Sequence, residues 1–164
     1  KGVAKAKGEW TIFMNSGDTF YDNNVLLSVF AKYHDKGESI ICGDTYYFNR
    51  ISGLKRHVTA SLIGKRKYMP SNHQSTFTRT SELKAHRFEL KYKVISDFAF
   101  YFDLYKRNSN YLIINKVISV YDDSGISSEN KTRNAKEFMI FFFNRFHYLF
   151  FVYLLIYLKR VFIK

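Results

Sequence analysis

Short apolar runs alternate with an amphipathic stretch over the first third of the chain. The runs at 9–14 and 39–43 are apolar and partly β-branched, which is typical of buried strands. Between them, the apolar residues Val25, Leu26, Val29 and Phe30 follow helical spacing. A strand, a helix and a second strand in this order predict an α/β sheet with parallel strands.

The same criteria extend the pattern to the end of the chain. The predicted strands are 75–78, 111–114 and 117–121, and the predicted helices begin at 81, cover 97–107, and run from about 132 to the C-terminus. No internal repeat interrupts this order. We therefore expect one α/β unit followed by a helical segment.

Polar turns follow the first two predicted strands. Asn15-Ser16-Gly17-Asp18 comes after the first, and Gly43-Asp44 comes after the second. Ligands of open α/β sheets gather at the carboxyl ends of the strands, so the two turns are expected to share a site. The alternative is ordinary turn chemistry, in which Asp and Gly are common.

Composition excludes several classes of protein. With 46% hydrophobic and 24% charged residues in 164, the chain is neither wholly disordered nor a low-complexity fibre. Its single cysteine, Cys42, excludes an internal disulfide and fits a reducing compartment. Because Cys42 lies in a predicted strand and has no Cys or His at ligand spacing, we expect it in the core.

The formal net charge of +12 is confined to two blocks, +9 over residues 50–93 and +5 over residues 129–164. Basic residues together with 19% aromatics are a feature of nucleic-acid binders. No recognised nucleic-acid motif is present, however, and A/T-rich codon bias raises Lys and aromatics together. The blocks are suited to a polyanion, a pyrophosphate or an anionic membrane surface, or form a solvated basic face.

Five motifs occur in an order that resembles the second half of a bacterial family 2 glycosyltransferase, nearest to those that make colanic acid, capsular or lipopolysaccharide sugars. They are KGVAKAKGEWTIFMNSGDTFYD, ICGDTYYF, NHQSTFTR, ISDFAFYFDLYKR and ISVYDDSGISSEN. The resemblance covers residues 1–128 and implies a partial GT-A fold, a Rossmann-like α/β sheet that binds a nucleotide-diphosphate sugar. The N-terminal βαβ part of the family is lacking, and the first residue is Lys1, so we expect a piece of a longer enzyme.

The resemblance implies a donor site. Asn15-Ser16-Gly17-Asp18 aligns with the family's acidic metal loop, and only Asp18 keeps a carboxylate. Asp18 is therefore the expected ligand of Mg²⁺ or Mn²⁺, which one or two carboxylates plus phosphate oxygens and water can hold. Asn15 and Ser16 are expected beside the donor diphosphate. His73 and Gln74 match the family's HQ pair and are expected to contact the donor.

Asp97 matches the acid that opens the acceptor-side helix and serves as the catalytic base of this inverting class. The helix dipole favours its anion, and the alternative role is that of a helix N-cap. Asp44 is placed on the acceptor side. The loop Gly125-Ile126-Ser127-Ser128 either folds over the donor or is an ordinary turn.

These residues lead to one predicted function and two alternatives. The protein is expected to move one sugar from a nucleotide-diphosphate sugar to a saccharide or lipid-linked acceptor. Gln74 is the only Gln in the chain, so the Gln-x-x-Arg-Trp signature of processive synthases is absent. The alternatives are a non-catalytic remnant or scaffold, and a basic nucleic-acid-binding module, for which only weak binding without sequence preference is expected.

Residues 129–164 are predicted to be a basic, apolar helical tail, separate from residues 1–128. Its uninterrupted apolar stretch, 148–158, is shorter than the roughly 20 residues that span a bilayer. An amphipathic helix with basic flanks, lying on the cytoplasmic face of the cell membrane, fits this pattern. A spanning helix from Phe138 and a helix bound in a partner's groove are the alternatives.

Overall fold

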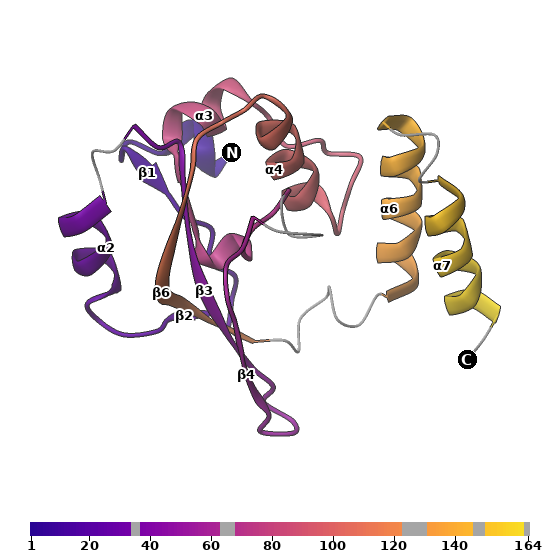
Figure 1. Ribbon diagram of the computed structural model, residues 1–164, viewed down its shortest axis with the longest axis horizontal. Coiled ribbons are helices and arrows are strands. Elements are labelled where there is room, and N and C mark those ends of the chain that lie inside the picture. Colours follow the sequence, from indigo (N-terminus) through magenta and orange to yellow (C-terminus); the bar gives the residue numbers. More distant parts are fainter. Residues whose placement is uncertain (34–36, 63–67, 123–130, 146–149, 163–164) are drawn as a thin grey trace.

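One mixed sheet organises the molecule. The computed structural model describes residues 1–33, 37–62, 68–122, 131–145 and 150–162. Its strands are β1 (Trp10–Thr11), β2 (Thr19–Phe20), β3 (Ile40–Phe48), β4 (Lys55–Val58), β5 (Thr76–Arg79) and β6 (Tyr111–Asp122). They are ordered β1-β5-β3-β6-β2, with β4 also paired to β3. Figure 1 shows β3 and β6 at the centre of the molecule. The fold is therefore α/β, as predicted.

Strand direction differs from the prediction at one strand. β3 and β6 are parallel, but β5 is antiparallel to both β1 and β3 and separates them. The chain reverses after β3, and both β4 and β5 run back along the β3 edge opposite β6. Hydrophobic alternation identifies a strand but carries no information on its direction, so the prediction of parallel strands was wrong for β5.

Gly43 allows β6 to pass close to β3. The chain forms one strand over Tyr111–Asp122 rather than the two predicted, and its register against β3 shifts on either side of Asp44. A Cβ atom at Gly43 would lie 2.4 Å from Ile118 Cγ1 and 2.6 Å from the Lys116 carbonyl oxygen. Only glycine fits between these two strands at that point.

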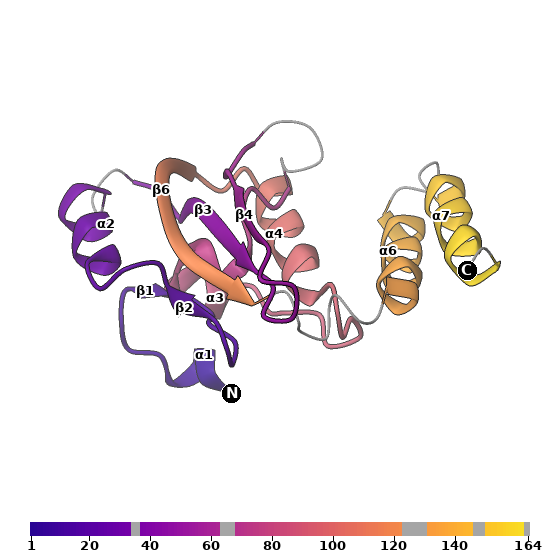
Figure 2. The same ribbon diagram turned by 90° about the horizontal axis from the view of Figure 1, so that it is seen from below.

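Helices cover both faces of the sheet (Figures 1 and 2). The helices among the described residues are α1 (Gly2–Lys5), α2 (Val25–Tyr33), α3 (Thr80–Ala85), α4 (Ser96–Lys106), α6 (Lys131–Arg145) and α7 (Phe150–Phe162), with a 3-10 turn, η2 (His73–Ser75). Val25 and Val29 of α2 pack on one face with Ile41. Leu83 of α3 and Leu104 of α4 belong to the core on the other face.

The C-terminal segment contains two described helices, where the sequence pattern predicted one. A third apolar cluster joins α6 to α4: Tyr92, Ile95, Ala99, Phe102, Phe141 and Phe142 are its buried members. α6 thus shares a core with residues before 128, and α7 packs against α6 on its far side (Figure 2). Within the described ranges, no helix combines the length and the apolar character needed to cross a membrane.

Glu137 fastens α6 to the segment that precedes α4. Its carboxylate accepts hydrogen bonds from the backbone N–H groups of Lys93, Val94 and Ile95 at 2.8–3.2 Å. Burial alone would raise the pKa of Glu137, but these donors and Arg133 outweigh it and lower that pKa below 4.5. The carboxylate thus holds three consecutive N–H groups next to α4.

We expect Glu137→Gln to lower the free energy of unfolding by about 1–2 kcal/mol at pH 7, because the amide offers one acceptor oxygen to three donors. Since the folded pKa lies below the unfolded one, the carboxylate's contribution is complete above pH 4.5 and is lost as the pH falls through the lowered value. Urea unfolding from pH 7 to pH 3 should show the difference in the free energy of unfolding between wild type and variant shrinking at acid pH.

Glu9→Gln, which breaks an exposed ion pair with Arg79, is the control. It should lower the free energy of unfolding by less than about 1 kcal/mol. A Glu137→Gln difference that does not vary with pH would contradict the prediction.

Candidate active site

A tight turn after β1 carries Asp18 to the end of β6. The Asp18 N–H donates to the Asn15 carbonyl oxygen at 3.1 Å, and Gly17 has a φ of 96°, which favours glycine. A Cβ at Gly17 would lie 3.2 Å from Asp122 Oδ2, so a side chain would crowd this approach. The loop at residues 15–18, predicted to form the donor site, therefore lies against Asp122, the last residue of β6.

Three N–H donors hold the Asp18 carboxylate. Oδ2 accepts from the Asn15 backbone at 3.2 Å and from Gln74 Nε2 at 2.9 Å, and Oδ1 accepts from the Asp122 backbone at 3.1 Å. Gln74 is buried, with 1% of its surface exposed. Asp18 and Gln74 are 56 residues apart in the sequence, and the fold brings them into contact.

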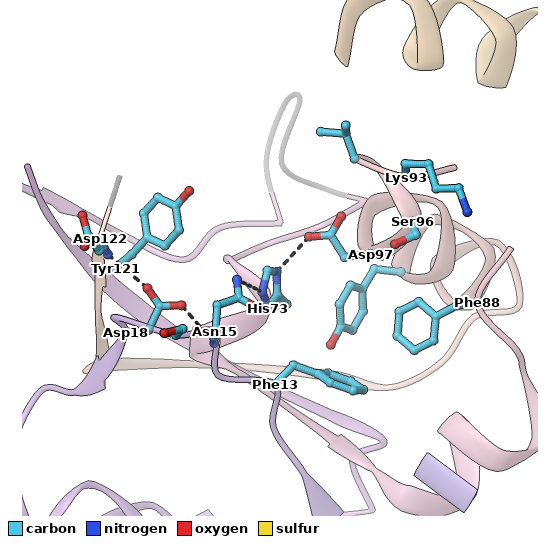
Figure 3. Close-up of a pocket in the computed structure, with 13 residues that line it drawn as sticks. Phe13, Asn15, Asp18, His73, Phe88, Lys93, Ser96, Asp97, Tyr121 and Asp122 are labelled. Carbon is cyan, nitrogen blue, oxygen red and sulfur yellow. Dashed lines mark hydrogen bonds and ion pairs between the residues drawn. The ribbon is translucent and has the colours of Figure 1, made fainter. Parts of the chain in front are cut away.

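His73 connects Asn15 to Asp97. His73 Nδ1 lies 2.9 Å from Asp97 Oδ2, and Nε2 lies 3.1 Å from Asn15 Nδ2 (Figure 3). A carboxylate only accepts, so Nδ1 carries the hydrogen, and a neutral ring then accepts the Asn15 amide at Nε2. Both ring nitrogens are thus engaged within the protein, and the His73 ring orients Asp97.

Asp97 lies in the first turn of α4. The N-cap position is Ile95, whose apolar side chain forms no capping hydrogen bond. The interpretation of Asp97 as the N-cap is therefore wrong. Its Oδ1 accepts from the Phe98 backbone at 2.7 Å, and 28% of its side chain is exposed. A carboxylate oxygen has two acceptor positions, so Asp97 keeps acceptor capacity beyond these contacts.

Buried hydroxyl groups fix the segment that carries His73 and Gln74. Ser75 Oγ donates to the Asp44 carbonyl oxygen at 2.9 Å and lies 2.7 Å from Ser119 Oγ. Thr45 Oγ1 donates to Ser75 Oγ at 2.9 Å. β3 and β6 therefore hold η2 in place through side chains that have almost no solvent contact.

Two cavities meet at this chain of contacts. The larger, about 670 Å³, is lined by Asn15, Ser16, Asp18, His73 and Asp97, together with other residues labelled in Figure 3. The smaller, about 420 Å³, shares Asn15, His73 and Asp97 with it and adds Gln74. All the residues predicted for the donor site and the base thus line one cavity or the other.

Asp44 lies elsewhere. The sequence pattern placed Gly43-Asp44 at a strand end, but β3 continues to Phe48 and both residues are inside it. The Asp44 carboxylate is buried, lies 2.9 Å from His57 Nε2, and accepts from the Ala60 N–H at 2.8 Å. It lines neither cavity. Asp44 anchors the segment after β4, and the prediction of one site shared with the first turn was wrong.

Asp122 and Arg50 belong to the site although the sequence interpretation did not assign them. Asp122 Oδ2 lies 2.7 Å from Arg50 Nε, and Arg50 Nη2 donates to the Gly17 carbonyl oxygen at 3.4 Å. The acidic pair at 122–123, directly after a predicted strand, was the available signal. No sequence signal pointed to Arg50, because only the β3–β4 hairpin brings it next to Asp122.

The Asp18 carboxylate is suited to a cation that takes most of its other ligands from phosphate oxygens and water. The described residues contain no group of three or more His, Cys, Asp or Glu side chains that could hold a metal ion. Oδ1 of Asp18 accepts one hydrogen bond from the described residues and keeps one acceptor position. Mg²⁺ commonly takes one carboxylate and completes its shell with phosphate and water, so the residues fit such an ion.

Two further predictions concern Cys42 and the loop at residues 125–128. Cys42 is fully buried as predicted, and burial raises the pKa of its thiol to about 12. This thiol stays protonated and unreactive at neutral pH. The loop Gly125-Ile126-Ser127-Ser128 lies outside the described residues.

Comparison with known proteins supports the sequence interpretation. The family model described as Glycosyl transferase family 2 matches residues 1–111, two thirds of the chain. No curated protein matches the chain closely. The matched range includes Asp18, His73 and Asp97, and the α/β architecture is that of a partial, Rossmann-like GT-A fold. The chain therefore belongs to glycosyl transferase family 2, the glycosyltransferases that bind a nucleotide-sugar donor and an acceptor.

Proposed function

We propose that this protein transfers one sugar from a nucleotide-diphosphate sugar to a saccharide or lipid-linked acceptor in surface polysaccharide synthesis, with inversion at the anomeric carbon. The observation that carries the proposal is that two carboxylates line the same cavity. Asp18 and Asp97 both line it, and the Asn15–His73 pair connects the loop of one to the carboxylate of the other.

Asp97 is the proposed general base. Its carboxylate accepts the proton of the acceptor hydroxyl as the oxygen attacks the anomeric carbon. His73 holds Oδ2 through Nδ1–H, and Asn15 keeps the imidazole in the tautomer that can donate there. Attack from the face opposite the diphosphate leaving group inverts the anomeric configuration, and the fixed carboxylate supplies the alignment.

Asp18 is the proposed ligand of Mg²⁺ or Mn²⁺, with Asn15 and Ser16 beside the donor diphosphate and Gln74 acting on the donor side through its hydrogen bond to the Asp18 carboxylate. The ion would offset the negative charge that develops on the leaving diphosphate. Gln74 and the Asp122 backbone fix the Asp18 carboxylate in one orientation.

The proposal is tested by incubating the protein that carries this chain with a panel of nucleotide sugars. Release of nucleoside diphosphate is measured, and the anomeric configuration of the product is determined by NMR. Release is expected to stop with EDTA and to return with Mg²⁺ or Mn²⁺. No release from any donor would favour the non-catalytic scaffold, retention would exclude the inverting mechanism, and EDTA resistance would exclude the ion at Asp18.

α7 is the proposed contact with the cytoplasmic face of the membrane. Phe151 and Leu155 lie one turn apart and are 67% and 68% exposed, and Leu158 is 38% exposed. Lys159 is exposed at the end of the same helix. An exposed apolar face with basic flanks is suited to an anionic lipid surface.

We expect Leu155→Glu to reduce cosedimentation with phosphatidylglycerol vesicles by about tenfold, because a charge replaces a side chain in the acyl boundary. Asn144→Glu, on the exposed surface of α6, adds the same charge and is the control. It should reduce binding no more than about fivefold, since one charge changes the electrostatic attraction by about 1 kcal/mol at most. Equal losses in the two variants would mean that charge alone, and not insertion of α7, governs the contact.

A further inference from the structure

The smaller cavity adjoins the candidate base, and Asp18 does not line it. Asp97 and His73 line both cavities, whereas Asp18 and Ser16 line only the larger one. Tyr47, Arg56 and Asn72 line only the smaller one. The two spaces thus differ in chemistry and meet at the same carboxylate.

This arrangement meets a requirement of the proposed reaction. In an inverting transfer the acceptor hydroxyl approaches the anomeric carbon opposite the leaving diphosphate, and the base must reach that hydroxyl. If the diphosphate lies beside Asp18, the acceptor must approach Asp97 from another direction. The smaller cavity is the space that offers this approach.

Aromatic rings form much of its wall. Tyr47 meets Tyr121 edge-on at 5.0 Å between ring centroids, and Phe98 meets Phe138 edge-on at 4.9 Å. The Tyr47 hydroxyl is held by the Asn72 side chain, at 3.0 Å from Oδ1 and 2.8 Å from Nδ2. Rigid apolar faces with a few fixed polar groups are typical of small-ligand sites, and such faces can pack on the C–H faces of a sugar ring.

Arg56 supplies the positive charge of this cavity. Its guanidinium carbon lies 4.5 Å from the centre of the Tyr47 ring, which positions it by cation–π contact. Within the part of the chain that the structure describes, Arg56 forms no ion pair, whereas Arg50 and Arg145 are paired with carboxylates. A stacked, exposed guanidinium keeps its hydrogen-bond donors for a carboxylate or phosphate.

α6 completes the cavity. Asn134 and Phe138 line it from that helix, and Glu137, between them in sequence, fixes α6 to the backbone before α4. The segment that the sequence pattern assigned to a tail therefore contributes a wall next to Asp97.

We propose that the smaller cavity is the acceptor subsite and that it selects a saccharide bearing an anionic group, which Arg56 binds. The inference rests on the proposed function for the identity of the acceptor. The anionic group is either a carboxylate of the sugar or a phosphate that links the saccharide to a lipid.

The test measures binding of three probes that share an octyl chain and a glucose ring. Octyl glucuronide carries a carboxylate, glucosyl octyl phosphate carries a phosphate, and octyl glucoside is neutral. Affinities are determined by saturation-transfer NMR titration for wild type, Arg56→Gln and Arg56→Lys. Lys55→Gln is the matched control, since it removes the same charge from the neighbouring position of β4 but lines neither cavity.

Arg56→Gln is expected to weaken at least one anionic probe roughly tenfold and the neutral probe less than about twofold. Arg56→Lys should recover part of this loss, and Lys55→Gln should leave all three affinities unchanged. The more strongly affected anionic probe identifies the source of the group. Equal weakening of neutral and anionic probes, an equal effect of Lys55→Gln, or no binding of any probe would overturn the inference.

The same variants separate this inference from the proposed function. Arg56-dependent binding without turnover of any nucleotide sugar would reject the transferase and keep the anionic subsite. Turnover of a donor with no effect of Arg56→Gln on acceptor KM would keep the transferase and reject the subsite. Because Arg56 is on the surface, circular dichroism melting should give the same midpoint for wild type and variants.

Discussion

Asp97→Asn is expected to lower the rate of sugar transfer by about 10²–10⁴-fold. The amide is isosteric with the carboxylate and its one oxygen can still accept from His73 Nδ1–H, while the amide nitrogen gives up the hydrogen bond from the Phe98 N–H. It cannot take a proton from the acceptor hydroxyl at neutral pH. The loss is therefore expected in kcat, with little change in donor KM, and is measured by steady-state transfer assays.

Asp103→Asn is the control for this substitution. Asp103 lies on the same helix, and its side chain is 40% exposed and paired with Arg145. The identical chemical change there should lower the stability of the fold by about 0–1 kcal/mol. Because Asp103 lines neither cavity, the rate should change less than about twofold. Activity that survives Asp97→Asn would remove Asp97 from the role of base, while the family assignment would stand.

Gly43→Ala is expected to lower the free energy of unfolding by about 3 kcal/mol. The new methyl group would meet Ile118 Cγ1 at 2.4 Å and the Lys116 carbonyl oxygen at 2.6 Å. A backbone oxygen cannot rotate away as a side chain can, so β3 and β6 must separate locally. Urea unfolding followed by circular dichroism measures the change.

Gly2→Ala provides the comparison for this variant. A Cβ atom at Gly2 has no neighbour within 4 Å, so this variant should match wild type within about 1 kcal/mol. If Gly43→Ala were as stable as Gly2→Ala, the close approach of β6 to β3 at this position would be refuted.

Local pattern was sufficient for the elements that have a clear periodicity. The helix at 97–107 and the strand at 75–78 were predicted within one or two residues of α4 and β5. Their positions follow from hydrophobic spacing and local propensity, which are properties of neighbouring residues. The continuity of β6 was not predictable in this way, because it depends on Gly43 in another strand.

The site residues also divide into those that a sequence motif identifies and those whose place depends on the fold. Asp18, His73 and Asp97 carry a motif order that the sequence displays, and the fold brings them to one cavity. Asp44 carries an equally suggestive Gly-Asp pair, yet it is buried inside β3 and bonded to His57. Arg56 has no motif, and its place depends on the β3–β4 hairpin.

Hydrophobic periodicity and the order of short motifs were enough to predict the class of fold, the family and the residues that bear the expected chemistry, because both can be recognised along the chain without knowledge of the fold. Strand direction, the separation of Asp44 from the site and the docking of α6 were evident only in the folded molecule. The same is true of His73, which bonds Asp97 through one nitrogen and Asn15 through the other. These outcomes depend on contacts between segments tens of residues apart, whose geometry is set by packing and hydrogen-bond satisfaction across the whole molecule.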